Sequence, residues 1–504
     1  MGGKEGLKTS EFVGRIADGS IGNVELDKGG YWSDKYAIWV DKRFISERGK
    51  LIPEEREVVD ILSEVGLAVG KVFEQQIDDV NKGLMYPIVI FEEGGVDIFK
   101  SALPLNPTLG DPYTITPDLN LPAIPYSHAY RIQLEGLNQI LLKLSLKDSP
   151  SARALRGYIE AVIKAYAFDP ERKSDIDAMH EVDMQWVQIP EDTSLLVIIE
   201  PSEVYLDPAR VAIGQDPEVY QWAKNVRAVN QLGPWRNFFE FRLLSRDESM
   251  VSDREANSIK ATSRNLFASS DDSVVSSSLE FRRLLLSSGN GAHPVKTAKN
   301  YPNFGDIRDN VGYKNILYTN MITEGVTSQQ LPVLRVIFGS DYVERLDTER
   351  LIRGSALRVL AHEVNHPFRI QSDASLEELK ATINGFITLM NSNEISDEDI
   401  DNALRSSIGY SFFIRNRVQA SREAGDEQKQ RADEAYFKAD TILMNYFVRY
   451  GVFTNEGIDF VRAREALRLL SDDLERARVD NAFAQSIFRN SGSEEVWKLF
   501  GNNV

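Results

Sequence analysis

The sequence predicts an α+β protein in which a part that mixes strands and helices precedes a mostly helical part. Short apolar runs bounded by turn-forming residues recur in the first 225 residues, at 36–40, 86–91 and 194–199. Such runs are typical of strands. From residue 320 onward, apolar residues recur at helical spacing among mixed charges, which indicates amphipathic helices.

Two segments before residue 320 have a helical pattern. Residues 53–73 begin with Pro53, followed by Glu54 and Glu55. Proline and acidic residues both suit the first turn of a helix, and apolar residues at helical spacing follow. Residues 226–290 show a broken helical pattern, so this stretch is also predicted to be largely helical.

Composition restricts the classes of partner and site. The net charge of -18 repels phosphate backbones and anionic membranes, so neither nucleic acid nor a membrane is expected as a partner. The chain has no cysteine, so a zinc site must use histidine and carboxylate ligands. No run of about 18 apolar residues predicts a membrane span. The N-terminus has no apolar signal core, and the simplest expectation is a soluble cytoplasmic protein.

The most informative motif is H-E-V-N-H at residues 362–366. Residues four apart lie on one face of a helix, so His362 and His366 could grip one zinc ion from the same side. Glu363 would then lie beside the open position of the metal, where it can take a proton from a bound water. The alternative is a surface helix turn with two ordinary histidines, although the chain has only five histidines in all.

A catalytic zinc usually has a third protein ligand. Pro367 should end or kink the first helix, and Glu377 and Glu378 then open a second helical pattern. A carboxylate in the first turn of a helix packed antiparallel to the first could complete the site. The alternative is the ordinary preference of acidic residues for the beginning of a helix.

Three further motifs accompany the histidine motif. Residues 377–381 read E-E-L-K-A with Gly385 beyond them, residues 203–208 read E-V-Y-L-D-P, and residues 300–303 read N-Y-P-N. Together the four resemble the dipeptidyl peptidase III family of zinc exopeptidases, which pairs an H-E-x-x-(G)-H motif with a later E-E-x-[KR]-A motif. Four matches in the same order are far more specific than one zinc motif.

The resemblance implies a two-lobed fold with a substrate cleft between the lobes. One lobe would be mixed, with a β-barrel core, and the other would be mostly α-helical and carry zinc. The expected segments are the mixed lobe at 1–225, a helical segment of the upper lobe at 226–285, a return to the mixed lobe at 286–320, and the helical catalytic lobe at 321–504.

The resemblance also implies the roles of the residues at the metal. One zinc ion would be held by His362, His366 and Glu378, and Glu363 would be the general base. Glu377 would orient one of the two histidines.

Five further residues would act on the substrate. Tyr205 would hydrogen-bond the developing oxyanion, and Glu203, Asn300 and Asn303 would hold the free amino terminus and first peptide unit. Tyr436 stands where the family has a histidine that stabilises the transition state. A phenol can still donate a hydrogen bond there.

The sequence therefore predicts a zinc-dependent exopeptidase that releases dipeptides from the free amino terminus of short peptides. Two alternatives remain open: a zinc hydrolase of the same fold with a non-peptide substrate, and a non-catalytic descendant that binds a peptide or a partner protein. Glu363 argues against the second alternative, because a purely structural zinc site needs no base. No feature of the sequence predicts an oligomeric state.

Overall fold

The chain divides into two compact units. The computed structural model describes residues 9–17, 25–27, 29–33, 36–78, 113–115, 123–172, 176–203, 236–267, 277–289, 297–302, 307, 310–366, 374–423, 427–454, 457–480, 482–483, 486–487 and 492–500. Unit 1 consists of Met1–Asp247, Ser273–Val295 and Asn300–Lys314, and unit 2 of Glu248–Asp272, Lys296–Lys299 and Asn315–Val504.

The main sheet has the strand order β1-β2-β3-β8-β10-β9, with β7 also paired to β8 and β6 paired to β7. Its strands are β1 (Glu25–Asp27), β2 (Gly30–Ser33), β3 (Ile38–Asp41), β6 (Leu195–Glu203), β7 (Arg236–Arg246), β8 (Ser277–Gly289), β9 (Ala298–Tyr301) and β10 (Tyr313–Tyr318). The pairs β6–β7 and β7–β8 are antiparallel and long. Within the described residues, this order does not close into the barrel that the resemblance implied.

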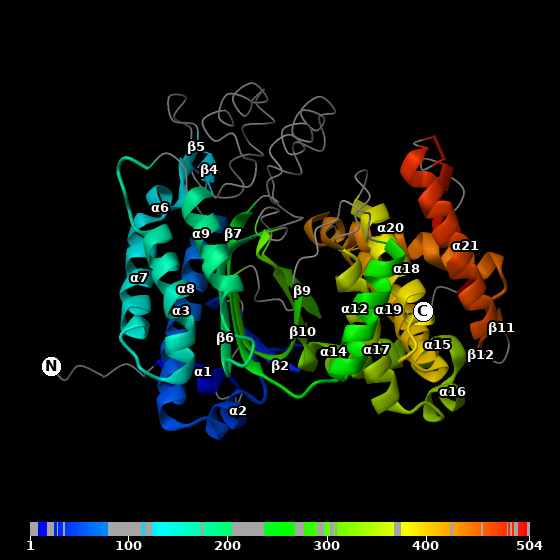
Figure 1. Ribbon diagram of the computed structural model, residues 1–504, viewed down its shortest axis with the longest axis horizontal. Helices are drawn as coiled ribbons and strands as arrows, with labels where there is room; N and C mark the ends of the chain where they lie inside the picture. The colour runs from blue at the N-terminus through cyan, green and yellow to red at the C-terminus, as the bar shows by residue number, and fades with distance from the viewer. Residues whose placement is uncertain are drawn as a thin grey trace. The chain divides into compact units, whose positions relative to one another are not determined.

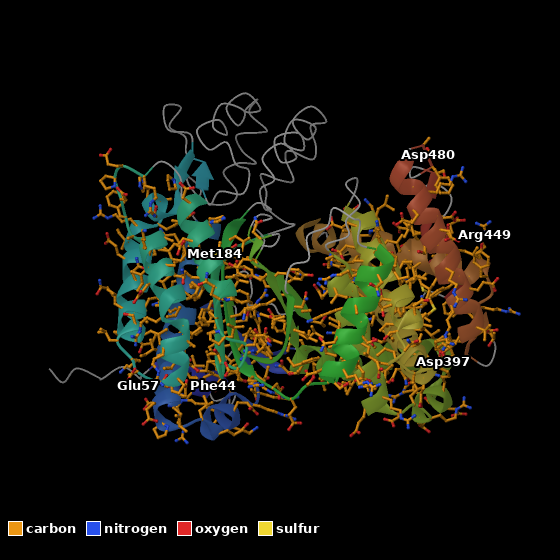
Figure 2. The ribbon with its side chains drawn as sticks, in the orientation of Figure 1. Phe44, Glu57, Met184, Asp397, Arg449 and Asp480 are labelled. Atoms are coloured by element: carbon orange, nitrogen blue, oxygen red, sulfur yellow. The ribbon has the colours of Figure 1, made fainter. Side chains whose placement is uncertain are left out.

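Helices cover this sheet and extend the mixed part. They are α1 (Thr9–Ala17), α2 (Phe44–Lys50), α3 (Pro53–Asp78), α6 (Tyr126–Ala129), α7 (Arg131–Ser145), α8 (Pro150–Tyr166) and α9 (Ile176–Val187), with a small hairpin of β4 (Tyr113–Ile115) and β5 (Ala123–Pro125). Helix α2 begins at Phe44, which is labelled in Figure 2. The Phe44 side chain is fully buried.

Helix α3 begins at Pro53, as the sequence predicted, and packs against β7 and β8. Gly66 lies at the closest approach, since a Cβ there would be 2.7 Å from Leu286 and 3.1 Å from Phe241. The spacing of its apolar residues thus buries one face of α3 on the sheet.

The predicted helical character of 226–285 is wrong for its described part, apart from α12 (Asp253–Phe267), because β7 and β8 occupy most of the remainder. Charged residues in these strands interrupt the apolar pattern that predicts a strand. Glu280 is buried and accepts hydrogen bonds from Arg282 Nε at 2.8 Å and from Lys314 Nζ at 2.9 Å. Buried charges that are paired in this way can occupy a strand interior, although a pattern of apolar residues does not reveal them.

Unit 2 is mostly helical, as predicted for the later chain. After α12 its elements are α14 (Thr319–Glu324), a π-helix (Gly325–Gln330), α15 (Leu331–Phe338), α16 (Ser340–Glu344), α17 (Thr348–Asn365), α18 (Ala374–Asn391), α19 (Asp397–Glu423), α20 (Glu427–Arg449), the hairpin of β11 (Phe453–Thr454) and β12 (Gly457–Ile458), α21 (Phe460–Val479) and a 3-10 helix (Glu494–Phe500). Helices α17, α18, α19 and α20 form its centre: α17 packs on α18 and α19, and α20 packs on the same two helices (Figure 1).

Close helix contacts in this bundle occur at glycines. A Cβ at Gly354 of α17 would lie 2.6 Å from Asn402 of α19, and a Cβ at Gly385 of α18 would lie 3.0 Å from Ala361 of α17. The backbones therefore meet with little space between them on both sides of α17. None of the described helices is long and apolar enough to cross a membrane.

Candidate metal centre

The two histidines of the motif lie at the end of α17. Its first turn is capped by Asp347, whose side chain accepts hydrogen bonds from the backbone N–H groups of Glu349 and Arg350 at 3.0 and 3.2 Å. His366 follows the last helical residue with φ -57° and ψ -37°, so the backbone keeps its helical course there. The rings of His362 and His366 consequently lie 4.5 Å apart, centroid to centroid, with an angle of 87° between their planes.

Glu363 belongs to the same cluster. One potential ligand atom from each of His362, Glu363 and His366 lies within 4.8 Å of the other two, and all three residues are half-buried. The structure therefore brings together the three residues that the sequence motif singled out.

Glu378 approaches this cluster through His362. It lies in the first part of α18 with a side chain about 7% exposed, and its Oε2 is 3.3 Å from Nε2 of His362. This buried Oε2 has no hydrogen-bond partner. Glu377, its neighbour in the first turn of α18, is half-buried.

The separation between Glu378 and His362 fits two ligands of one zinc ion. Two ligands on a tetrahedral zinc with bonds of about 2.1 Å lie roughly 3.4 Å apart, close to the separation of Glu378 Oε2 and His362 Nε2. A carboxylate oxygen and an imidazole nitrogen that face each other with lone pairs need a proton or a cation between them. An imidazole–carboxylate donor set is one that zinc accepts.

The second ring nitrogen of His362 is also engaged. Its Nδ1 hydrogen-bonds with Oγ1 of Thr382, one turn after Glu378 on α18, at 3.1 Å. A metal-binding histidine commonly has its second nitrogen held in this way, which fixes the ring and leaves the first nitrogen for the metal. Burial disfavours the charged ring, but the Glu378 carboxylate beside it outweighs this effect and holds the pKa of His362 above its usual value.

Asn365, inside the histidine motif, anchors the end of α17. Its Nδ2 donates to the carbonyl of Ala361 at 2.7 Å and to Oγ1 of Thr388 on α18 at 3.2 Å. Its Oδ1 accepts a hydrogen bond from Oγ of Ser263 on α12 at 2.9 Å. Asn365 is 1% exposed, so these contacts fix the last turn of α17 in the interior of unit 2.

Sequence reasoning missed two charged residues near this cluster. Arg358 lies one turn before His362 on α17, and its guanidinium lies 4.8 Å from the ring centre of Tyr410 on α19. Asp440 lies on α20, where burial raises its pKa to about 7, although the Ser411 hydroxyl and the Arg358 charge oppose this rise. Arg358 lies four residues before His362, and Asp440 lies four residues after Tyr436. This helical spacing is the signal that could have identified them.

The remaining predicted site residues are Glu203, Tyr205, Asn300, Asn303 and Tyr436. Tyr205 and Asn303 lie outside the described residues, and Glu203 is the last residue of β6. Asn300 lies in β9, and Tyr436 in α20; both are half-buried. Their roles stay predictions.

Comparison with known proteins decides the fold. No protein-family model matches the chain, and no curated protein matches it. Among solved structures, the DPP III of Caldithrix abyssi matches with a TM-score of 0.63 and 15% identity, over 90% of this chain and 95% of that one. The dipeptidyl-peptidase III of Corallococcus sp. strain EGB matches with a TM-score of 0.56 and 16% identity, over 78% of this chain and 70% of that one.

The chain has a dipeptidyl peptidase III-like fold. At these identities the likeness concerns the fold, and it confirms the resemblance that four short motifs indicated. The histidine cluster of α17 thus lies in a chain that is similar in fold to two peptidases.

Proposed function

We propose that the protein is a zinc-dependent exopeptidase that releases dipeptides from the free amino terminus of short peptides. The observation that carries the proposal is the cluster of His362, Glu363 and His366, with the buried Oε2 of Glu378 3.3 Å from His362 Nε2. The likeness in fold to two dipeptidyl peptidase III structures favours a peptide as the substrate.

His362, His366 and Glu378 would hold one zinc ion, and Glu377 would orient one of the histidines. When bound, zinc supplies a Lewis acid and lowers the pKa of a water molecule on it. The Thr382 hydroxyl keeps the His362 ring in the orientation that this ligand set needs.

Glu363 would act as the general base. Its carboxylate takes a proton from the attacking water as the new carbon–oxygen bond forms, and it passes that proton to the nitrogen as the peptide bond breaks. The hydroxyl groups of Tyr205 and Tyr436 would donate hydrogen bonds to the oxygen that gains charge in the transition state. Glu203, Asn300 and Asn303 would bind the amino terminus and the first peptide unit of the substrate.

The test is a digest of a synthetic peptide library by protein of measured zinc content, read by mass spectrometry. We expect dipeptides to be released from free amino termini. In Glu363→Gln, zinc content should stay the same while hydrolysis falls by at least about a hundredfold, since the substitution removes only the base. An active Glu363→Gln protein would contradict the proposed role of this residue.

The same experiment separates the two alternative functions. A protein with full zinc that leaves every peptide intact would favour a hydrolase with a non-peptide substrate. If the unaltered protein binds peptides but hydrolyses none of them, the result would favour a non-catalytic descendant of a peptidase that binds peptides.

A further inference from the structure

Arg358 is a cation beside the candidate metal centre that forms no ion pair with a described residue, although the charges of Asp440 and Glu363 act on it. Its Nε is buried and has no hydrogen-bond partner. Among the described residues, Arg358 makes no hydrogen bond and no ion pair, and its contact is with the ring of Tyr410 at 4.8 Å. Of the five N–H donors of the guanidinium, the buried one at Nε is left for a group that the described chain does not supply.

Asp440 is an acid that also has a buried polar atom without a hydrogen-bond partner. It is 8% exposed, and its Oδ2 is buried without a hydrogen-bond partner. No ion pair joins Asp440 to a described residue, although the charge of Arg358 is close enough to affect it. A direct ion pair between the two would have satisfied both groups, and the fold does not form one.

The two residues belong to one place in unit 2. Helix α19 packs on both α17 and α20, and its neighbouring residues Tyr410 and Ser411 lie beside Arg358 and Asp440 respectively. The charges of His362 and Glu378 also act on Asp440, which places this pair near the candidate zinc ligands.

Buried polar groups without hydrogen-bond partners destabilise a fold, and charged groups do so more strongly. Such groups concentrate at functional sites, where a ligand completes their hydrogen bonds. The ligand must offer an acceptor to Arg358 and a donor to Asp440. A substrate carboxylate would pair with Arg358 but would be repelled by the Asp440 carboxylate. A substrate cation would pair with Asp440 but would be repelled by Arg358. One residue of an extended peptide offers its carbonyl oxygen and its N–H on the same side, without net charge.

We propose that Arg358 and Asp440 together bind the backbone of one substrate residue. The Arg358 guanidinium donates to the carbonyl oxygen of that residue, and the Asp440 carboxylate accepts from its N–H. The inference rests on the proposed peptide substrate. It assigns two substrate-binding residues that recognise backbone rather than side chains at their subsite.

The experiment uses peptides in which each amide in turn is replaced by an ester, which removes one N–H and leaves the carbonyl. Binding is measured by calorimetry in the full-length Glu363→Gln protein, which should not hydrolyse them. With Asp440 present, we expect the ester at one position to weaken binding about tenfold or more, the value of a charge-assisted hydrogen bond. In the Asp440→Ala background, the same ester and its parent amide should bind equally.

Matched variants separate the loss of one hydrogen bond from a general disturbance of the structure. Asp472→Ala removes an exposed acid of α21 and should leave the ester effect intact. Asp440→Asn keeps the shape of the side chain and should reduce the ester effect without abolishing it, because a neutral amide oxygen still accepts. This variant provides the measurement if Asp440→Ala does not fold.

The outcomes separate the inference from the proposed function. If peptides bind and are cleaved by the unaltered protein but no ester position depends on Asp440, the inference is wrong and the exopeptidase proposal stands. If the dependence is found without cleavage, the inference stands and the exopeptidase proposal is wrong. A further result would overturn the inference. If amidation of the peptide's carboxyl terminus weakens binding to the protein with Arg358 but not to Arg358→Met, then Arg358 binds a carboxylate.

Discussion

At the scale of single residues, the orientation of His362 is set by α18 rather than by its own helix. Thr382 holds Nδ1 at 3.1 Å, and Glu378 lies 3.3 Å from Nε2. Both partners come from consecutive turns of α18, so the spacing that pairs His362 with His366 on α17 is complemented by a second helical spacing. Metal binding should therefore depend on particular side chains of α18.

Glu378→Ala should lose most of the bound zinc, because it removes the buried oxygen that faces His362. Glu377→Ala is the matched variant from the same turn and should weaken binding less, since this residue is proposed only to orient a histidine. Elemental analysis after dialysis against a weak chelator measures the difference. Full zinc in Glu378→Ala would show that the third ligand is another residue.

Tyr436→Phe tests whether the phenol replaces the histidine found at this place in the resembled family. A hydrogen bond that forms only in the transition state should affect turnover more than substrate binding. We expect kcat to fall by about tenfold, the effect of a hydrogen bond worth about 1.4 kcal/mol, with little change in KM. Unchanged kcat in steady-state assays would exclude this role for Tyr436.

At the scale of secondary-structure elements, the centre depends on the close approach of α17 and α18. Asn365 joins the end of α17 to Thr388 of α18 and to Ser263 of α12. Gly385 lets the two backbones meet, because a Cβ there would lie 3.0 Å from the carbonyl carbon of Ala361 and 3.1 Å from the backbone nitrogen of His362. The histidine and its partners on α18 are thus held by helix packing.

Gly385→Ala should force α18 away from α17 by a few tenths of an ångström. We expect a loss of about 1–3 kcal/mol in the free energy of unfolding, as for other overpacked sites, and weaker zinc binding. Gly136→Ala in α7 is the control, because nothing lies within 4 Å of a Cβ there and the helix should gain up to about 1 kcal/mol. Urea unfolding and zinc titration measure both effects. Zinc affinity unchanged in Gly385→Ala would show that helix spacing does not control the centre.

At the scale of the whole molecule, the sequence predicted what depends on local spacing. The contact of His362 with His366 follows from a separation of four residues, and the start of α3 at Pro53 follows from first-turn preferences. Residues that come near one another only in the folded bundle, such as Arg358 and Asp440, carry no local pattern that joins them.

The errors have the same physical origin. Strands β7 and β8 were not recognised because buried charges interrupt their apolar residues, and pairing across the sheet supplies partners that the sequence alone does not reveal. The implied barrel was also a long-range property, and the described strands form an open order in its place. The likeness in fold to dipeptidyl peptidase III emerged from motifs spread over the chain, since their order is itself long-range information.

The proposed dipeptide specificity is tested on matched peptides with a free and an acetylated amino terminus. A free amino terminus is a cation, and in a partly dry site it needs a carboxylate and hydrogen-bond acceptors, the groups that Glu203, Asn300 and Asn303 are proposed to supply. Acetylation removes that charge, so the initial rate should fall by about a hundredfold or more through lost transition-state binding. Glu203→Gln should reproduce the loss on free peptides and change the rate on acetylated ones little. Equal rates on the two peptides, or cleavage within long chains, would show that the zinc centre acts without recognising the amino terminus, and the substrate would then be selected by other residues.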